Sequence, residues 1–381
     1  MRRLPLALAT LLLCLLPLGA PAEELGDAVY KAIEALDLAE LTRVEREQGL
    51  VGGDLPSLVR AFASGQPVLS AEQLLDWLKR EALATLQTSL WRMTRLLAPA
   101  LLLGALAQGR ASFAGGYVAK ACQYAGLLLV MGFLVADLTE HVALAKTSVA
   151  GMADTMQALF PLLVTLLAAV GGTASAAFFQ PTVVAASGTM TSLIQNATLP
   201  LAVATAVLTM LGGLCEGFHV KRLTRLCRQA AHWTLGVSVT VFIGVTIVQG
   251  LGTAAVDGVS IRTAKYALDN FVPIVGGMFA DTVDTLVGCS LLVKNAVGVV
   301  GLLLLVGRML GPMLQTVCTM LLYRGAAALL EPVSDASLCG CVGDFADCFQ
   351  LLFIIQLSVG AMFLLLVAQL LVVGNLTVML R

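Results

Sequence analysis

Residues 257–301, with the sequence DGVSIRTAKYALDNFVPIVGGMFADTVDTLVGCSLLVKNAVGVVG, decide how this chain can fold. Between residues 271 and 293, 11 leucine, isoleucine, phenylalanine or valine residues each favour membrane insertion by about −0.3 to −0.6 kcal/mol. The two aspartates between them oppose insertion by about +2.5 to +3.5 kcal/mol each. The sum is near zero, so this stretch does not enter lipid by itself.

Helical spacing indicates where the charges of this stretch lie. One face carries small and acidic residues that step by four, three and four positions: Gly277, Asp281, Asp284 and Gly288. Large apolar residues fall opposite: Phe279, Val283 and Leu286. Three interpretations remain open. The segment is an amphipathic helix on the membrane surface, a helix whose acidic face lines a hydrated cavity inside a bundle, or an ordinary loop.

Composition identifies the class of protein. Of 381 residues, 58% are hydrophobic and 12% charged, and the mean hydropathy is +0.90, as in a polytopic membrane protein. With a net charge of −1, the chain has no general excess of basic residues, so nucleic acid is not an expected partner. The lipid bilayer is an expected partner.

The N-terminal part has the pattern of an exported protein. Residues 1–22 join two arginines to an apolar run and an Ala-Pro-Ala end, which predicts a signal peptide, with an uncleaved anchor as the alternative. Residues 23–95 hold 20 of the 47 charged residues and predict a small helical extracytoplasmic region. Within it, Ser70 to Gln73 form a capping box that opens a helix.

Residues 96–381 are expected to form a polytopic membrane domain, which makes the fold an all-α transmembrane helix bundle. The uncharged run 155–215 is long enough for about three passes of about 20 residues each. Segments 295–306 and 312–330 are short for two spans, and residues 331–347 resemble an acidic outer loop. We expect seven to nine membrane segments, some of them re-entrant, with the basic residues 221–228 in the cytoplasm.

Glycine and proline mark expected helix breaks or close helix packing. The candidates are Gly171, Gly172, Pro181, Pro273, Gly276, Gly277 and Gly288. The similar motifs LFPL at 159–162 and FVPI at 271–274 are consistent with an internal repeat of broken helices, or with chance.

Catalytic signatures are absent from the sequence. It contains no HExxH, no GxxxxGK[ST] and no G-x-S-x-G motif, so we expect neither an enzyme nor a cofactor. The group Cys339, Cys341 and Cys348 lacks a nearby histidine and the C-x-x-C spacing of a metal site. If these residues face outward, one disulfide among them is an alternative, whereas a zinc site is not expected.

Several long strings resemble the stage III sporulation protein AE family of endospore-forming bacteria. They include GGTASAAFFQP at 171–181, DGVSIRTAK at 257–265, NFVPIVGG at 270–277 and KNAVG at 294–298. The likeness extends to the final GNLT at 374–377, although residues 23–95 match only in character.

The resemblance implies a component of the channel complex between mother cell and forespore, in the mother-cell membrane that surrounds the forespore. It also implies partners: other stage III sporulation A proteins and, through them, the forespore Q protein. A homo-oligomer is a further assembly that the glycine content allows.

Three functional hypotheses follow. In the first, the bundle lines part of a conduit, with Asp281, Asp284 and Lys294 facing the pore or cavity. Its gate or docking edge would be Arg262, Lys265 and Asp269, of which the last two are four residues apart and can pair on a helix. In the second, the chain is a structural scaffold for ring-forming sporulation proteins. In the third, it is a stand-alone secondary transporter.

Overall fold

The structure is a computed structural model that describes residues 39–48, 55–63, 71–108, 116–214, 220–271, 276–332 and 336–379. Over residues 251–271 and 276–285 it describes the backbone and only three side chains, those of Asp257, Val259 and Thr263.

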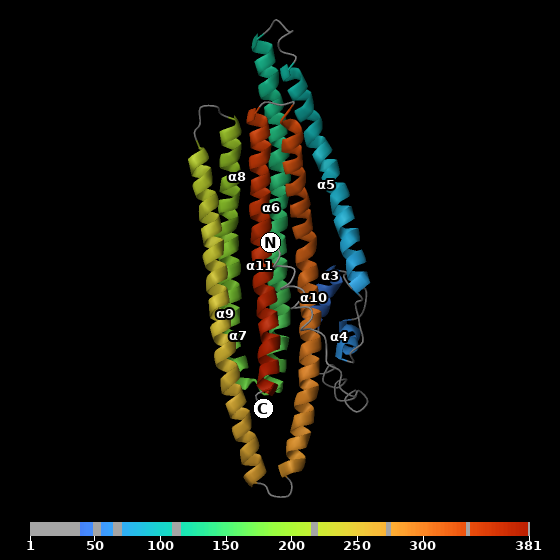
Figure 1. Cartoon of the computed structure of the whole chain (residues 1–381), viewed down its shortest axis with the longest axis vertical. Coiled ribbons are helices and arrows are strands. Elements are labelled where there is room, and N and C mark those ends of the chain that lie inside the picture. Colours follow the sequence, from blue (N-terminus) through green and yellow to red (C-terminus); the bar gives the residue numbers. More distant parts are fainter. Residues whose placement is uncertain are drawn as a thin grey trace.

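Helices account for nearly all of the described residues, and no strand occurs among them, which confirms the all-α prediction. The long helices run side by side in one elongated bundle (Figure 1). In chain order, the described helical elements are α3 (Ala39–Gln48), α4 (Leu55–Ala63), α5 (Ala71–Gln108), α6 (Gly116–Ala169), α7 (Thr173–Leu193), the π-helix η2 (Ile194–Thr198), α8 (Leu199–Leu214), α9 (Lys221–Phe271), α10 (Gly276–Leu330) and α11 (Ala336–Met379).

Five stretches of the described chain are long and apolar enough to cross a membrane. They are Tyr124–Ala169, Thr173–Gly212, Lys221–Gly250, Leu286–Leu330 and Cys339–Leu376. Each has at least 30 residues, well above the roughly 20 that a crossing requires. The membrane character of the chain is therefore supported, whereas the expected seven to nine segments are not confirmed.

The uncharged run after residue 155 is divided differently from the expectation. The helical path is interrupted at Gly171-Gly172, where Gly171 has a φ of 101° that other residues rarely adopt. After this turn, α7, η2 and α8 follow one another without a gap from Thr173 to Leu214. Pro181 lies inside α7 and does not end it. Three passes were expected here, but the chain completes α6 and then forms one long helical path.

Two other expected boundaries are also helical. Segments 295–306 and 312–330 belong to the single helix α10, which continues through Pro312. The acidic segment expected as a loop is helical from Ala336 onward, because α11 begins there. By contrast, α5 begins at Ala71, as the capping box predicts, and it continues through residue 95 without a break.

The core lies where α10 and α11 pack against α6. Its fully buried side chains include Leu134, Leu305, Phe345, Phe349 and Val367. In Figure 1, α3 and α4 lie beside the middle of α10. Leu41, Leu55 and Val59 point into the bundle from these short helices and are buried.

Two flanks of the bundle differ in polarity. On α3, Glu40 and Arg43 are 66% exposed and form a surface ion pair of 3.4 Å. On α9, the large exposed hydrophobic side chains from Trp233 to Val248 include Val237 and Val241, and among these positions Thr240 is an exposed polar residue. The bundle therefore has a charged flank at α3 and an apolar flank at α9.

Candidate functional site

Lys294 is the most unusual side chain of the apolar interior. It lies within the α10 span and is only 1% exposed. Its Nζ donates a hydrogen bond to the carbonyl oxygen of Leu371 on α11 at 3.0 Å and a longer one to that of Leu370 at 3.5 Å. Among the described residues, no carboxylate pairs with it. Amines buried within membrane spans are costly, which makes Lys294 a candidate functional residue.

The room for this amine comes from a glycine. Gly374 lies on α11 opposite Lys294, and an added Cβ there would overlap Nζ. Carbonyl oxygens have two lone pairs, so the helical carbonyls of α11 can accept a bond from Lys294 besides their own helical partner. Lys294 and Gly374 thus form one matched contact between two helices.

A second buried charge holds the broken end of a helix. Asp257 on α9 is fully buried, and its carboxylate accepts hydrogen bonds from the backbone N–H groups of Ala174 at 2.8 Å and Ser175 at 3.0 Å. These groups belong to the first turn of α7, directly after the Gly171-Gly172 break. A carboxylate at this position satisfies free N–H donors and complements the positive end of the helix dipole.

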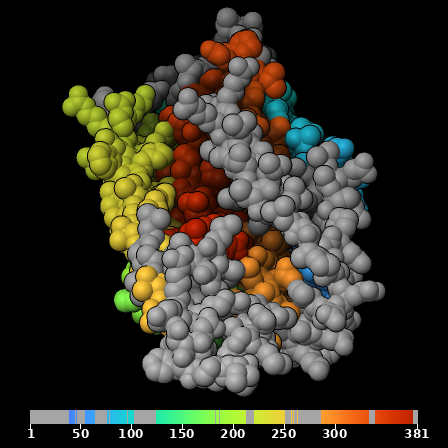
Figure 2. All heavy atoms as spheres, turned by 60° about the horizontal axis from the view of Figure 1, so that its bottom comes forward, coloured from blue at the N-terminus to red at the C-terminus, as the bar shows by residue number. Residues whose placement is uncertain are grey.

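A third polar contact joins α9 and α11. Gln369 donates from its side-chain amide to the carbonyl oxygen of Thr246, and Gly250 leaves room for that amide. The residues beside it line a groove of about 350 Å³ whose other walls are apolar, including Phe242 and Leu365. Figure 2 shows α11 recessed beside α9 on this side of the bundle.

Lys294, Asp257 and Gln369 share one architecture, and we call them the inner polar contacts. Each side chain crosses from its own helix to backbone groups of another helix. Together they tie α7, α9, α10 and α11. Inside a membrane, such hydrogen bonds satisfy polar groups that lipid cannot satisfy, and they fix helix positions.

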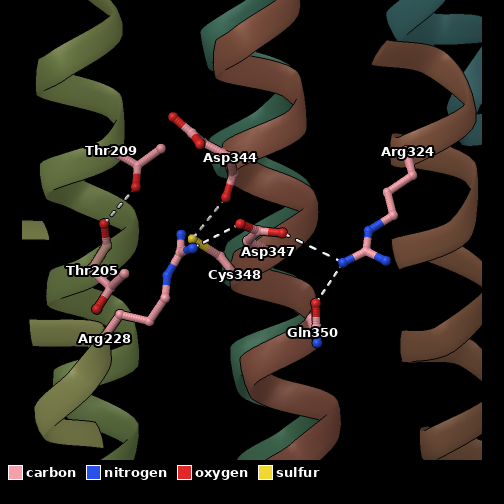
Figure 3. Close-up of polar contacts among 8 residues, drawn as sticks. All are labelled: Thr205, Thr209, Arg228, Arg324, Asp344, Asp347, Cys348 and Gln350. Atoms are coloured by element: carbon pink, nitrogen blue, oxygen red, sulfur yellow. Dashed lines mark hydrogen bonds and ion pairs between the residues drawn. The ribbon is translucent and has the colours of Figure 1, made fainter. Parts of the chain in front are cut away.

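A charged network lies nearer the other end of α11 (Figure 3). Asp347 accepts hydrogen bonds from Arg228 of α9 at 2.7 Å and from Arg324 of α10 at 3.5 Å. Arg324 also donates to the side-chain carbonyl oxygen of Gln350. We call Arg228, Arg324, Asp347 and Gln350 the Asp347 network.

Further polar contacts extend from this network to α5 and α6. The Tyr323 hydroxyl donates to Asp137 at 2.6 Å, and Arg92 pairs with Glu140 at 2.6 Å. The ring of His141 lies edge-on to Phe349, with centroids 5.0 Å apart. Sequence reasoning missed these residues. The available signal was that Asp137, Glu140 and His141 interrupt an otherwise apolar run.

The predicted pore and gate residues do not all come together. Lys294 is 10 and 13 positions from Asp284 and Asp281, about 15–20 Å along α10. It faces α11 and lies inside the protein. Asp281 and Asp284 on α10, and Arg262, Lys265 and Asp269 on α9, have side chains outside the described residues.

The residues predicted to break helices or to pack helices closely also differ in where the structure places them. Gly171 and Gly172 form the helix break, whereas Pro181 is an exposed residue within α7. Gly288 has open space where a side chain would be, so it makes no close packing contact with described atoms. Gly276 and Gly277 begin α10, and Pro273 lies outside the described residues.

The three C-terminal cysteines are free thiols on α11 and contact separate partners. Their sulfurs lie near the Ala327 carbonyl, the Met131 sulfur and the Asp344 carbonyl, respectively. The disulfide that the sequence left open is therefore not present. Within the described part of the chain, no three histidine, cysteine or acidic residues are placed to hold a metal.

A family model described as Stage III sporulation protein AE matches residues 54–374, most of the chain. This chain belongs to that family. The Stage III sporulation protein AE of Bacillus subtilis (strain 168) is 36% identical to it over 243 residues. The alignment covers 63% of this chain but only 61% of the relative, less than two thirds of its length. No solved structure matches the chain.

The family match bears directly on the contacts described above. Residues 54–374 begin one position before α4 and end at Gly374, so they include all the inner polar contacts and the Asp347 network. The AE-family region therefore covers the bundle from α4 to Gly374, near the end of α11. Helix α3 lies outside it.

Proposed function

We propose that this chain is an integral membrane subunit of the sporulation channel complex that links mother cell and forespore. In this role it supports forespore development and lines part of a conduit. The observation that carries the proposal is the AE-family match over a bundle with five membrane-length helices. The family resemblance implies its place in the mother-cell membrane around the forespore, beside other stage III sporulation A proteins that reach the forespore Q protein.

The two flanks of the bundle favour an assembled wall over a lone carrier. Exposed valines and Trp233 on α9 suit lipid, whereas the charged side chains on α3 do not. Both flanks lie beside membrane-length helices. A subunit with one apolar and one charged flank fits the wall of a larger structure, with its charged flank toward water or a partner.

The residue roles within this proposal follow helical position. Asp281 and Asp284 line the conduit or cavity, and Arg262, Lys265 and Asp269 form its gate or docking edge. Lys294 anchors α10 to α11 behind that surface.

A structural scaffold is the second candidate, and the inner polar contacts favour it. Each of these side chains is engaged with a neighbouring helix, so each has a role in holding the bundle together. A scaffold needs such rigidity and needs no water path. A double variant, Asp281→Asn with Asp284→Asn, separates the two functions. A conduit loses spore formation while the complex still assembles, and a scaffold retains both.

Co-purification is the primary test of membership in the complex. The chain is solubilised from sporulating cells, and the proteins that travel with it are identified by mass spectrometry. We expect other stage III sporulation A proteins. A chain that is folded and active in sporulation but purifies without them would act as a stand-alone transporter.

Thiol accessibility tests the conduit itself. Single cysteines at positions 281, 284 and 288 should react with water-soluble thiol reagents in intact membranes. Cysteines at positions 279, 283 and 286 should not, because they occupy the opposite face. Equal reaction on both faces would leave a helix at the membrane surface and remove the conduit.

A further inference from the structure

The first turns of α9 carry a dense group of exposed cations. Lys221, Arg222 and Arg225 are exposed, and we call them the basic patch. Cations at the N-terminal end of a helix oppose its dipole, which favours anions there. The helix itself therefore gives no electrostatic reason for a basic patch at this end, and an external anion would compensate for it.

Neighbouring carboxylates satisfy only part of this charge. Arg228, one turn further along, pairs with Asp347 at 2.7 Å. Asp344 lies within electrostatic reach of Lys221 and Arg228. No carboxylate among the described residues pairs with Arg222 or Arg225. These two guanidinium groups are therefore available to a partner outside the described chain.

Large apolar side chains adjoin the two arginines. Leu226 and Trp233 are 62% and 66% exposed. They follow Arg222 by four and eleven positions, which places all three on one face of the helix. Beyond them, the exposed face continues with Val237 and Val248. The order along α9 is thus guanidinium groups first and large apolar side chains after them.

This order matches the layers of a bilayer surface. Guanidinium groups pair with phosphate, and the large apolar side chains that follow them along α9 suit the acyl chains. We propose that Arg222, Arg225, Leu226 and Trp233 form a docking surface for anionic phospholipid. Charge complementarity selects the headgroup, and the adjoining apolar face selects lipid over a soluble anion. The inference does not depend on whether the chain lines a conduit.

Native mass spectrometry of the full-length chain in detergent tests this surface, with phosphatidylglycerol and phosphatidylcholine as probes. Each exposed ion pair to a headgroup phosphate contributes at most roughly a fivefold gain in affinity. The double variant Arg222→Gln with Arg225→Gln should therefore bind phosphatidylglycerol more weakly, by up to roughly 30-fold. The matched control, Arg43→Gln with Arg46→Gln, removes two exposed arginines of α3 and should bind it as the unmodified chain does.

Two further comparisons of lipid binding test the proposal. The unmodified chain should prefer phosphatidylglycerol to phosphatidylcholine, and equal binding would overturn the proposal even if the variants fail to fold. Leu226→Ala with Trp233→Ala should weaken lipid binding. If inorganic phosphate displaces the lipid fully and this apolar variant binds normally, the surface is a soluble-anion site. If the α3 control loses as much affinity for phosphatidylglycerol as the α9 variant, the loss reflects the overall charge of the protein, and the proposed docking surface on α9 is wrong.

Discussion

The ammonium group of Lys294 occupies the space that a side chain at Gly374 would fill, so these two residues specify one contact between α10 and α11. The lysine supplies hydrogen-bond donors in an apolar interior, and the glycine exposes the α11 backbone that accepts them. Substitution at either position therefore tests the contact.

Gly374→Ala should destabilise the bundle by about 1–3 kcal/mol, the usual cost of adding a methyl group to a packed interior. The methyl group would displace Nζ from the Leu371 carbonyl and leave a buried amine without acceptors. Thermal unfolding in detergent measures the change. Gly288→Ala is the matched control within the same membrane region, because open space surrounds that position.

Lys294→Leu should leave the bundle folded, because a shorter apolar side chain removes a buried charge rather than stranding one. Combined with Gly374→Ala, it should recover most of the stability that the alanine alone loses, since the overlapping ammonium is absent. A double-mutant cycle on unfolding free energies quantifies the coupling. Simple additivity of the two changes would show that the residues do not form one contact.

Asp257→Ala should loosen the start of α7, at a cost of about 1–2 kcal/mol for a lost helix cap. Asp257→Asn keeps one acceptor oxygen and should lose less. Hydrogen exchange of the Ala174 and Ser175 amides is the specific readout, because those groups donate to the carboxylate. Faster exchange confined to other helices would contradict the capping role.

Asp347→Ala should remove the polar link between α9 and α10 at this end of the bundle, because Arg228 and Arg324 both donate to that carboxylate. The groups are partly exposed, so a double-mutant cycle with Arg228→Ala should give a coupling of about 0.5–1 kcal/mol. The surface pair Glu40–Arg43 serves as the comparison and should give about 0–0.5 kcal/mol. A larger coupling at the α3 pair would reverse this ranking.

The two flanks should differ in their access to water. Cysteines at Val237 and Val248 on α9 should resist charged thiol reagents in intact membranes, because these exposed apolar positions would face lipid. Cysteines at Glu40 and Arg43 should react. The labelling yields are measured before and after the membranes are disrupted. Prompt labelling of Val248→Cys in sealed membranes would show that this position of α9 does not face lipid.

Local patterns predicted the helical class and the break at Gly171-Gly172, and they singled out Lys294 as a charge within an apolar segment. Hydropathy and glycine conformational freedom act over a few residues, so the linear sequence contains them. The acceptor of Lys294 lies 77 positions away at Leu371, and the donors to Asp257 lie 82 and 83 positions away. Contacts of that separation depend on helix packing, which periodicity does not specify.

The expected number of crossings depended on dividing apolar length by the thickness of a bilayer. Pro181 and Pro312 were natural places for such divisions, yet α7 and α10 continue through them. A neighbouring helix can satisfy or cover the backbone groups that a proline frees. The number of helices was therefore less predictable than their type.

The length of α10 extends the reach of the molecule. Its 55 residues form a rod of about 80 Å, against a hydrocarbon layer of about 30 Å. Helix α9 lies on the other side of α11 from α10, and α9 and α10 converge beyond the end of α11 (Figure 1). This chain can therefore meet a protein that stands well clear of the lipid surface, using the stiff continuation of its own spans as the arm.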